Sequence, residues 1–279
     1  MGKTNITDII DKKSLIVIIV LLIIVLFGIV VAFNKGYLGK KEINQGTTPA
    51  KKILETDIKD KSIITSLDMK VKYLNYYGKD AYYYTTDLYD KDLKEKNLSK
   101  DEKLLMILYA AISTNNLESP SIYELQEVFP NQVFTNQFDY KFITGSSIQN
   151  LYYQLFNDEL VNRTPSIGNN PEIIYNEKYN NYYIHFNGSN TNNNEILYYN
   201  YKYTEDEENY YVYIAATSIE KNDKGTINIY KSPTSKEVID TIEDTFKIDD
   251  TNYAKFTKYK IAFYKSETSS YFEYIEELK

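Results

Sequence analysis

An uninterrupted apolar run near the N-terminus constrains this chain most. From Leu15 to Phe33 the sequence reads LIVIIVLLIIVLFGIVVAF and contains no charged or polar side chain. A helix of that length covers about 30 Å at 1.5 Å per residue, which matches the hydrocarbon core of a bilayer. A cleaved signal peptide has a shorter apolar region and a small-residue cleavage site, which "VVAFNKG" does not offer. We therefore expect Leu15 to Phe33 to be an uncleaved transmembrane helix in contact with the lipid bilayer.

The orientation of this helix does not follow from flanking charge alone. The lysines on its two sides are nearly balanced: Lys3, Lys12 and Lys13 precede it, and Lys35, Lys40 and Lys41 follow it. Long domains translocate largely regardless of charge, and a chain without cysteine suits an extracytoplasmic space. We expect residues 1–14 to be a cytoplasmic tail and the C-terminal domain to lie outside the cell membrane. A tail this short holds no signalling module.

The rest of the sequence divides into a polar stalk and a larger acidic region. Residues 34–61 contain Gly, Pro and Lys with little periodic pattern, as is typical of a linker. Residues 1–61 carry 10 Lys against 6 Asp and Glu, a net charge of +4. Of the chain's 32 basic and 39 acidic residues, 22 and 33 then remain for residues 62–279, a net charge of −11. A region this acidic repels nucleic acid over most of its surface, so we expect no nucleic-acid partner.

Residues 62–160 are expected to form the helical part of an extracytoplasmic domain. In "LSKDEK", Ser99 and Glu102 have the spacing of a capping box, and Ser121 and Glu124 repeat it in "SIYELQEVF". The apolar positions with helical spacing, which we expect to face the core, are Ile64, Leu67, Val71 and Leu74; Leu104, Ile107, Leu108, Ala111 and Ile112; Ile122, Leu125, Val128 and Phe129; and, near 146–157, Ile148, Leu151, Tyr152, Leu155 and Phe156.

Residues 161–279 change to period-two alternation and are expected to form an antiparallel β part of the same domain. Short helical character is expected over residues 235–246. The predicted strands lie near 172–176, 181–187, 195–204, 209–219, 225–231, 256–265 and 270–278. The fold class is therefore α+β, with an N-terminal transmembrane helix and then a helical segment packed on a C-terminal antiparallel sheet.

The densest run of tyrosines, residues 195–217, is predicted to be a hairpin. If Glu205–Glu208 is a four-residue loop, alternation separates the side chains onto two faces. The core face would pair Tyr203 with Tyr210, Tyr201 with Val212, Tyr199 with Ile214 and Leu197 with Ala216. The opposite, partly wet face would carry Tyr198, Tyr211 and Tyr213. We take these three tyrosines as candidate binding residues, because aromatic rings stack on sugars and anchor protein interfaces.

The tyrosine content also has an explanation without function. The chain has 30 Tyr, no Trp and a single arginine, and it is rich in Asn, Ile and Lys. All of these abundant residues have A/T-rich codons, so a base bias of the genome accounts for much of the excess. The same alternation predicts a last hairpin around Ser266–Ser269, with Phe263 opposite Phe272, Ile261 opposite Tyr274 and Lys258 opposite Glu277.

The amino-acid composition excludes several kinds of catalytic and metal-binding site. The absence of cysteine excludes a disulfide framework and a thiolate site, and the single histidine excludes a His-based metal cluster. His185, in "NNYYIHF", is either a general base or pH-sensitive contact, or an ordinary half-exposed strand histidine. The acidic stretches at 205–208 and 249–250 lack the spacing of a calcium loop, so we expect them to be solvated turns. We expect no catalytic residue, no metal and no cofactor.

The layout as a whole resembles uncharacterised single-pass envelope proteins of A/T-rich Gram-positive bacteria. The resemblance rests on a lysine-containing tail, a Leu/Ile/Val anchor, a stalk, and then "LSKDEKLLMILYAA" ahead of Tyr-rich strands. A second likeness is to the anchored α+β domains of secretion and conjugation machinery, which act as assembly parts. Both imply a location in the cell envelope, and neither implies functional residues.

Three functions are compatible with these sequence features. The first is a membrane-anchored extracytoplasmic domain that binds an envelope protein or assembles in a complex without catalysis. The second is a carbohydrate-binding or carbohydrate-cleaving domain that uses tyrosine stacking and carboxylates. The third is a sensor that acts through a membrane partner.

Overall fold

In the computed structural model the described part of the chain begins at Leu54. The predicted tail, the transmembrane helix and most of the stalk lie outside the described residues. Among the helices that the structure describes, none combines the length and the apolar character needed to cross a membrane. The described residues are 54–79, 89, 93–114, 117–135, 137–166, 172–186, 194–222 and 225–279.

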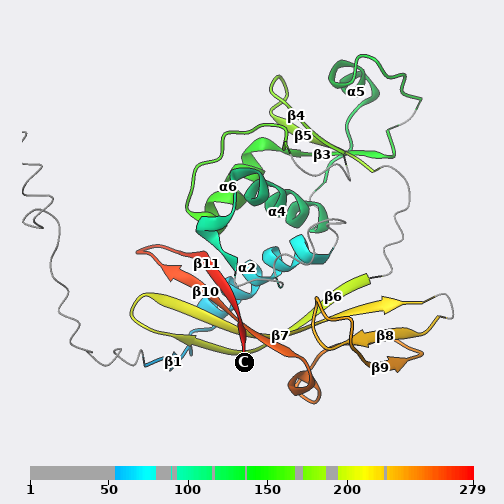
Figure 1. The fold of residues 1–279 in the computed structure, drawn as a ribbon. Coiled ribbons are helices and arrows are strands. Elements are labelled where there is room, and N and C mark those ends of the chain that lie inside the picture. The colour runs from blue at the N-terminus through cyan, green and yellow to red at the C-terminus, as the bar shows by residue number, and fades with distance from the viewer. Residues whose placement is uncertain are drawn as a thin grey trace, which may run out of the picture. The chain divides into compact units, whose positions relative to one another are not determined.

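Two antiparallel sheets enclose helices, as Figure 1 shows. The large sheet has the strand order β1 (Thr56–Asp57), β6 (Asn194–Glu205), β7 (Asn209–Lys221), β10 (Thr257–Lys265), β11 (Ser270–Leu278) and β2 (Leu93–Lys94). The far edge of β7 is shared: its first part pairs with β10 and its last part with β8 (Ile227–Tyr230), which pairs in turn with β9 (Val238–Ile242). The small sheet has the order β3 (Tyr140–Thr144), β5 (Asn181–His185) and β4 (Glu172–Asn176).

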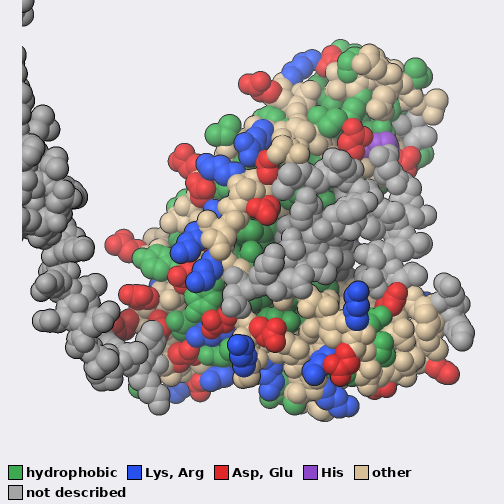
Figure 2. All heavy atoms as spheres, viewed as in Figure 1, with side chains coloured by type: hydrophobic (Ala, Val, Ile, Leu, Met, Phe, Trp, Pro, Cys, Tyr) green, Lys and Arg blue, Asp and Glu red, His purple; other side chains and the backbone are tan. Residues whose placement is uncertain are grey.

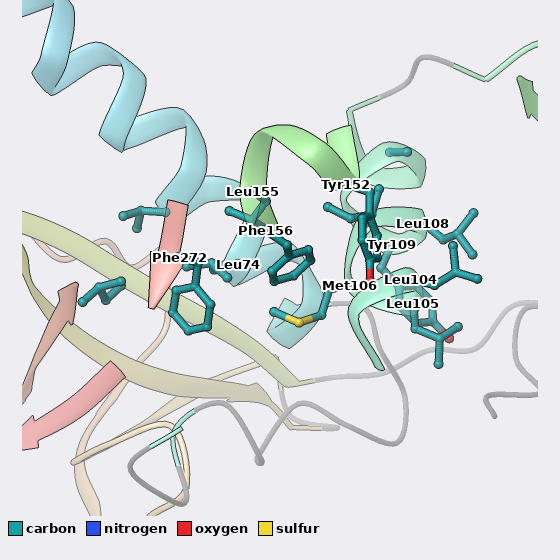
Figure 3. Close-up of a cluster of buried hydrophobic side chains, with 14 of the residues drawn as sticks. Leu74, Leu104, Leu105, Met106, Leu108, Tyr109, Tyr152, Leu155, Phe156 and Phe272 are labelled. Carbon is teal, nitrogen blue, oxygen red and sulfur yellow. The ribbon is translucent and has the colours of Figure 1, made fainter. Parts of the chain in front are cut away.

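The helices are α2 (Lys61–Lys79), α4 (Lys100–Ser113), α5 (Ile122–Val128) and α6 (Gly145–Phe156), with short 3-10 turns η2 (Glu95–Asn97) and η3 (Tyr253–Lys255). A mixed α+β fold with antiparallel sheet is therefore confirmed. The β structure is divided into two sheets, whereas the sequence suggested one. One apolar cluster joins both sheets to α2, α4 and α6, with α4 buried on nearly every side. Figure 3 shows Tyr152 and Phe156 of α6 close to side chains of α4, and Phe272 of β11 beside Leu74 of α2.

The predicted helix starts are formed by the expected caps. Ser99 Oγ accepts the amide of Glu102 at 3.2 Å, and the Glu102 carboxylate accepts the amide of Ser99 at 2.6 Å, so this capping box is confirmed. At α5 only half of the box forms. Ser121 Oγ accepts the amide of Glu124 at 3.1 Å, while the Glu124 carboxylate accepts the hydroxyl of Tyr183 instead. The Glu124 carboxylate, which the local sequence predicted to cap α5, is thus bonded to a tyrosine of the small sheet.

One predicted element has the wrong type. Residues 235–246 contain the strand β9 and no helix. Val238 and Ile239 are 46% and 37% exposed, whereas Ile242 and Phe246 pack against a small apolar cluster, so the four apolar residues do not share one core face. A short apolar run is compatible with both helical spacing and strand alternation. Here its pairing with β8 stabilises the strand. Strands β1, β2, β3 and β9 were not expected, since none has a clear alternating apolar pattern.

A bulge changes which tyrosines of β6 face the core. Near the turn Tyr203 lies opposite Val212, and not opposite Tyr210 as predicted. Between Asn200 and Lys202 the register shifts by one residue, which reverses the alternation beyond it. Tyr198, expected on the wet face, therefore packs against the main core. Tyr199 and Tyr201, expected in that core, pack in a second cluster around Ala215, Ile219, Ile229, Ile248 and Phe256.

The last hairpin repeats this behaviour. Phe263 lies opposite Phe272, as predicted. A second bulge, between Ala262 and Phe263, then moves Ile261 opposite Ile275 and Lys258 opposite Leu278, so those two predicted pairs are wrong. Alternation alone does not reveal a bulge, because the extra residue carries no sequence mark of its own.

Lys70 of α2 is buried against the start of β11. Its ammonium donates to the carbonyl of Ser270, lies 3.0 Å from Ser270 Oγ, and is 5.7 Å from the ring centroid of Tyr271. No carboxylate among the described residues pairs with it. Burial lowers the pKa of Lys70 to about 8.

We expect this lysine to make stability depend on pH. Below pH 8 the folded state holds a buried charge. Between pH 8 and the unfolded pKa of 10.5, the unfolded state binds more protons, so the free energy of unfolding rises with pH. Relative to Lys70→Met, the wild-type protein should gain about 1–2 kcal/mol between pH 7 and pH 9.5, after allowance for screening. Urea titrations of both proteins measure this, and parallel pH profiles would contradict it.

Candidate functional site

The predicted tyrosines Tyr211 and Tyr213 lie on the outer face of the large sheet, opposite the helices. Glu55, just before β1, is the common acceptor of this face. Its carboxylate accepts the Tyr213 hydroxyl at 2.5 Å, Thr204 Oγ1 at 2.6 Å and Lys260 Nζ at 2.9 Å. Burial alone would raise the pKa of Glu55, but these three donors hold it below its ordinary value. The polar groups here therefore satisfy one another.

The three candidate tyrosines are not equally available to a ligand. Tyr211 is only 4% exposed, its hydroxyl donates to Asp206 at 2.6 Å, and Lys260 Nζ lies 3.9 Å from its ring centroid. Burial and the Asp206 carboxylate both raise the pKa of Tyr211. Tyr213 is half-buried under Lys202, and Tyr198 packs against the main core. The structure does not bring the three together as one surface, and a binding role for them stays a prediction.

A hollow beside α6 has the features of a ligand site more clearly. It has a volume of about 710 Å³, which is in the range of small-molecule sites. It lies where the first turns of α6, the segment after that helix and the β4–β5 turn meet. Its lining residues are Gln149, Leu160, Val161, Asn162, Arg163, Tyr175, Glu177 and Asn180.

Side-chain amides and phenols form a connected network at this hollow. Asn180 Oδ1 accepts both Asn162 Nδ2, at 3.1 Å, and the Tyr175 hydroxyl, at 2.9 Å. The Tyr182 hydroxyl donates to Asn162 Oδ1 at 3.1 Å, and burial raises the pKa of Tyr182 to about 12. Gln149 Nε2 donates to the carbonyl of Leu160 at 3.0 Å. Such a network holds the lining side chains in defined positions before any ligand binds.

Two backbone features explain why the hollow forms at this point. Asn180 has a φ of 52°, in the left-handed region that asparagine tolerates better than most residues, and this turns the chain between β4 and β5. Gly145, at the start of α6, donates its amide to the Asn180 carbonyl at 2.6 Å. A Cβ at position 145 would lie 2.3 Å from Asn180 Oδ1 and 2.4 Å from Asn162 Nδ2. Glycine is therefore needed for the two amides to meet.

The hollow is close to neutral in charge and keeps free hydrogen-bonding groups. Arg163 pairs with Asp101 at 2.6 Å, and Glu177 is exposed. Burial would raise the pKa of Asp101, but donors from Ser166 and Arg163 hold it below its ordinary value. Within the described part of the chain, Asn180 Nδ2, Gln149 Oε1 and the Glu177 carboxylate have no hydrogen-bond partner. The site therefore offers both donors and acceptors to a polar ligand.

Sequence reasoning missed this site. Its residues come from three separate segments, and none has a spacing typical of a known motif. One available signal was the chain's only arginine, which stands in "NRTPSIGNNPE" between the helical and strand patterns. A second was "NEKYNN", a polar turn rich in asparagine between two apolar strands.

His185 and the two acidic stretches, the other candidates named from the sequence, have packing or hydrogen-bond partners within the fold. His185 stacks on Tyr140 at a ring-centroid distance of 4.1 Å, and its Nδ1 lies 3.4 Å from Glu172 Oε2. In the two acidic stretches, Asp206 accepts the amides of Glu208 and Asn209, each at 2.8 Å, and Asp250 accepts the Tyr199 hydroxyl. No group of three or more potential metal ligands occurs within the described ranges.

Figure 2 shows acidic and basic side chains interspersed over the face in view, and not gathered by sign. No known protein family, no curated protein and no solved structure matches this chain.

Proposed function

We propose that this protein is a membrane-anchored extracytoplasmic domain of the cell envelope that binds a ligand without transforming it. The observation that carries the binding role is the amide-lined hollow beside α6. The anchor is the apolar run from Leu15 to Phe33, and its length supports the membrane location.

The lining of the hollow favours a neutral carbohydrate as the ligand. Asn180 Nδ2 supplies a free donor and Gln149 Oε1 a free acceptor for sugar hydroxyl groups, and the Tyr175 ring supplies an aromatic surface. Arg163 is already paired with Asp101, and Glu177 is exposed to solvent, so neither supplies a desolvated charge that would hold an ion. A sugar chain outside the membrane has this chemistry.

The same lining supports binding over cleavage. Glycoside hydrolysis ordinarily needs two carboxyl groups that face the scissile bond. Glu177 is the one carboxylate among the lining residues, and it is exposed. The lining includes no serine, cysteine or histidine that could act as a nucleophile or general base.

Calorimetric titration of the full-length protein in nanodiscs tests this proposal. The probes are two neutral oligosaccharides, chitotetraose with N-acetyl groups and maltotetraose. We expect at least one of them to bind, and Gln149→Ala to weaken that binding by roughly tenfold, the loss of about one well-placed hydrogen bond. Asn180→Gly, which keeps the left-handed turn, should have a similar or larger effect.

A matched control lies on the same helix. Gln154 is also an exposed glutamine of α6, but it is outside the hollow and donates to Asn150 at 3.3 Å. Gln154→Ala should leave the affinity unchanged. Failure of both sugars to bind, or equal losses in the two glutamine variants, would argue against a carbohydrate site at this hollow.

A further inference from the structure

Strand β9 forms an open edge of the large sheet. It pairs with β8 on one side, and no strand among the described residues pairs with its other side. Its side chains are mostly exposed, including Val238 at 46% and Ile239 at 37%. An edge strand presents unpaired backbone N–H and C=O groups, which can extend a sheet by pairing with an added strand.

A second hollow adjoins this edge and is largely apolar. It has a volume of about 390 Å³, and its lining combines four apolar residues, Ile229, Ile239, Phe246 and Phe256, with Asp240, Asn252 and Lys255. Ile229 and Phe256 are 1% and 5% exposed, so they form a fixed floor. Alternate side chains of a strand point to the same face. A strand added to β9 would therefore place every second side chain on the face of the sheet that bears this hollow.

The charge around the edge selects the kind of strand that fits. Residues 237–250 contain six carboxylates and one lysine, Lys247, which lies 3.9 Å from Asp249; Lys236 precedes this stretch, and Lys255 lines the hollow. Asp240, Glu243 and Asp244 have no cation within ion-pair distance in the described ranges. Basic side chains on an incoming segment would complement these carboxylates.

We infer that β9 binds an extended basic segment of a partner protein by strand addition, with an apolar side chain of that segment in the hollow lined by Phe246 and Phe256. Backbone hydrogen bonds to the edge supply affinity, and the hollow and the carboxylates supply selectivity. This site is separate from the hollow beside α6 and does not depend on the carbohydrate proposal.

The test uses the full-length protein in nanodiscs and a fluorescent peptide that alternates lysine with valine around one central phenylalanine. We expect saturable binding by fluorescence anisotropy. The same peptide with N-methyl groups on alternate backbone nitrogens should bind at least about tenfold more weakly, because it cannot complete the ladder. Equal binding of the two peptides would overturn strand addition.

Two charge reversals separate a local site from general attraction to an acidic protein. Asp240→Lys should weaken the lysine peptide by roughly tenfold or more and improve binding of a glutamate version of it. Glu267→Lys, equally exposed but located in the β10–β11 turn, should leave the affinity unchanged. Equal losses in both variants, or no binding by the wild type, would overturn the proposal. So would self-association of the protein that Asp240→Lys abolishes, since a second copy would then occupy the edge.

Discussion

Phe263→Ala is expected to lower the free energy of unfolding by about 3–5 kcal/mol, the typical cost of removing a fully buried phenylalanine. Phe263 of β10 is 0% exposed and lies between Tyr210 of β7 and Phe272 of β11. Its ring centroid is 6.3 Å from that of Phe272, with the rings nearly perpendicular. The variant loses this packing and leaves a cavity between the sheet and the helices. For a domain of this size the midpoint temperature should fall by on the order of 10 °C in a thermal melt.

The neighbouring residue provides the control for this prediction. Tyr264 is 52% exposed and points to the opposite face of the same strand. Tyr264→Ala should change the free energy of unfolding by less than about 1 kcal/mol. If the two variants were equally destabilised, the assignment of faces in β10 would be wrong.

The proposed membrane orientation predicts an all-or-none labelling pattern. The chain contains no cysteine, so a single introduced cysteine is the only thiol. Glu267→Cys, in an exposed turn of the large domain, should react fully with a membrane-impermeant maleimide on intact cells. Asn5→Cys, in the tail, should react only after the cells are lysed.

Other labelling patterns have definite meanings. The reverse pattern would place the domain inside and would contradict the proposed location. Labelling of neither position before lysis would show that both lie within the cytoplasm. Deletion of residues 15–33 should move the protein from the membrane to the soluble fraction, because the segment alone supplies about 30 Å of apolar helix.

Local patterns predicted the elements of this fold well and their pairing less well. The helices at Ser99 and near Ile148 and the strand 172–176 were predictable, because caps, apolar stripes and alternation are local properties. The two bulges were not, and each reversed one stretch of side chains. Tyr198 and Tyr199 exchanged faces for this reason alone. Strand β3 was not predicted, because it lacks a clear alternating pattern and its pairing with β5 joins two segments that are distant in the sequence.

The candidate site could not be predicted from the sequence, for a related reason. Gln149, Asn162 and Asn180 are polar residues in a helix, a loop and a turn, and each is ordinary by itself. Their assembly around one hollow depends on the contact of Gly145 with Asn180, which joins the start of a helix to a turn 35 positions later. The phenols of Tyr175 and Tyr182 also hold this network, and neither was among the tyrosines predicted to bind a ligand.

The short strand β1 has a mechanical consequence for a tethered protein. The chain enters the described unit at Leu54, and its first sheet contacts are the pairs Thr56 with Glu205 and Asp57 with Thr204. Tension on the tether would act on these two pairs and on Glu55 before it reached α2 or the core. Because Glu55 joins β1 to Thr204, Tyr213 and Lys260 on three different strands, it would distribute that load across the sheet instead of peeling one strand.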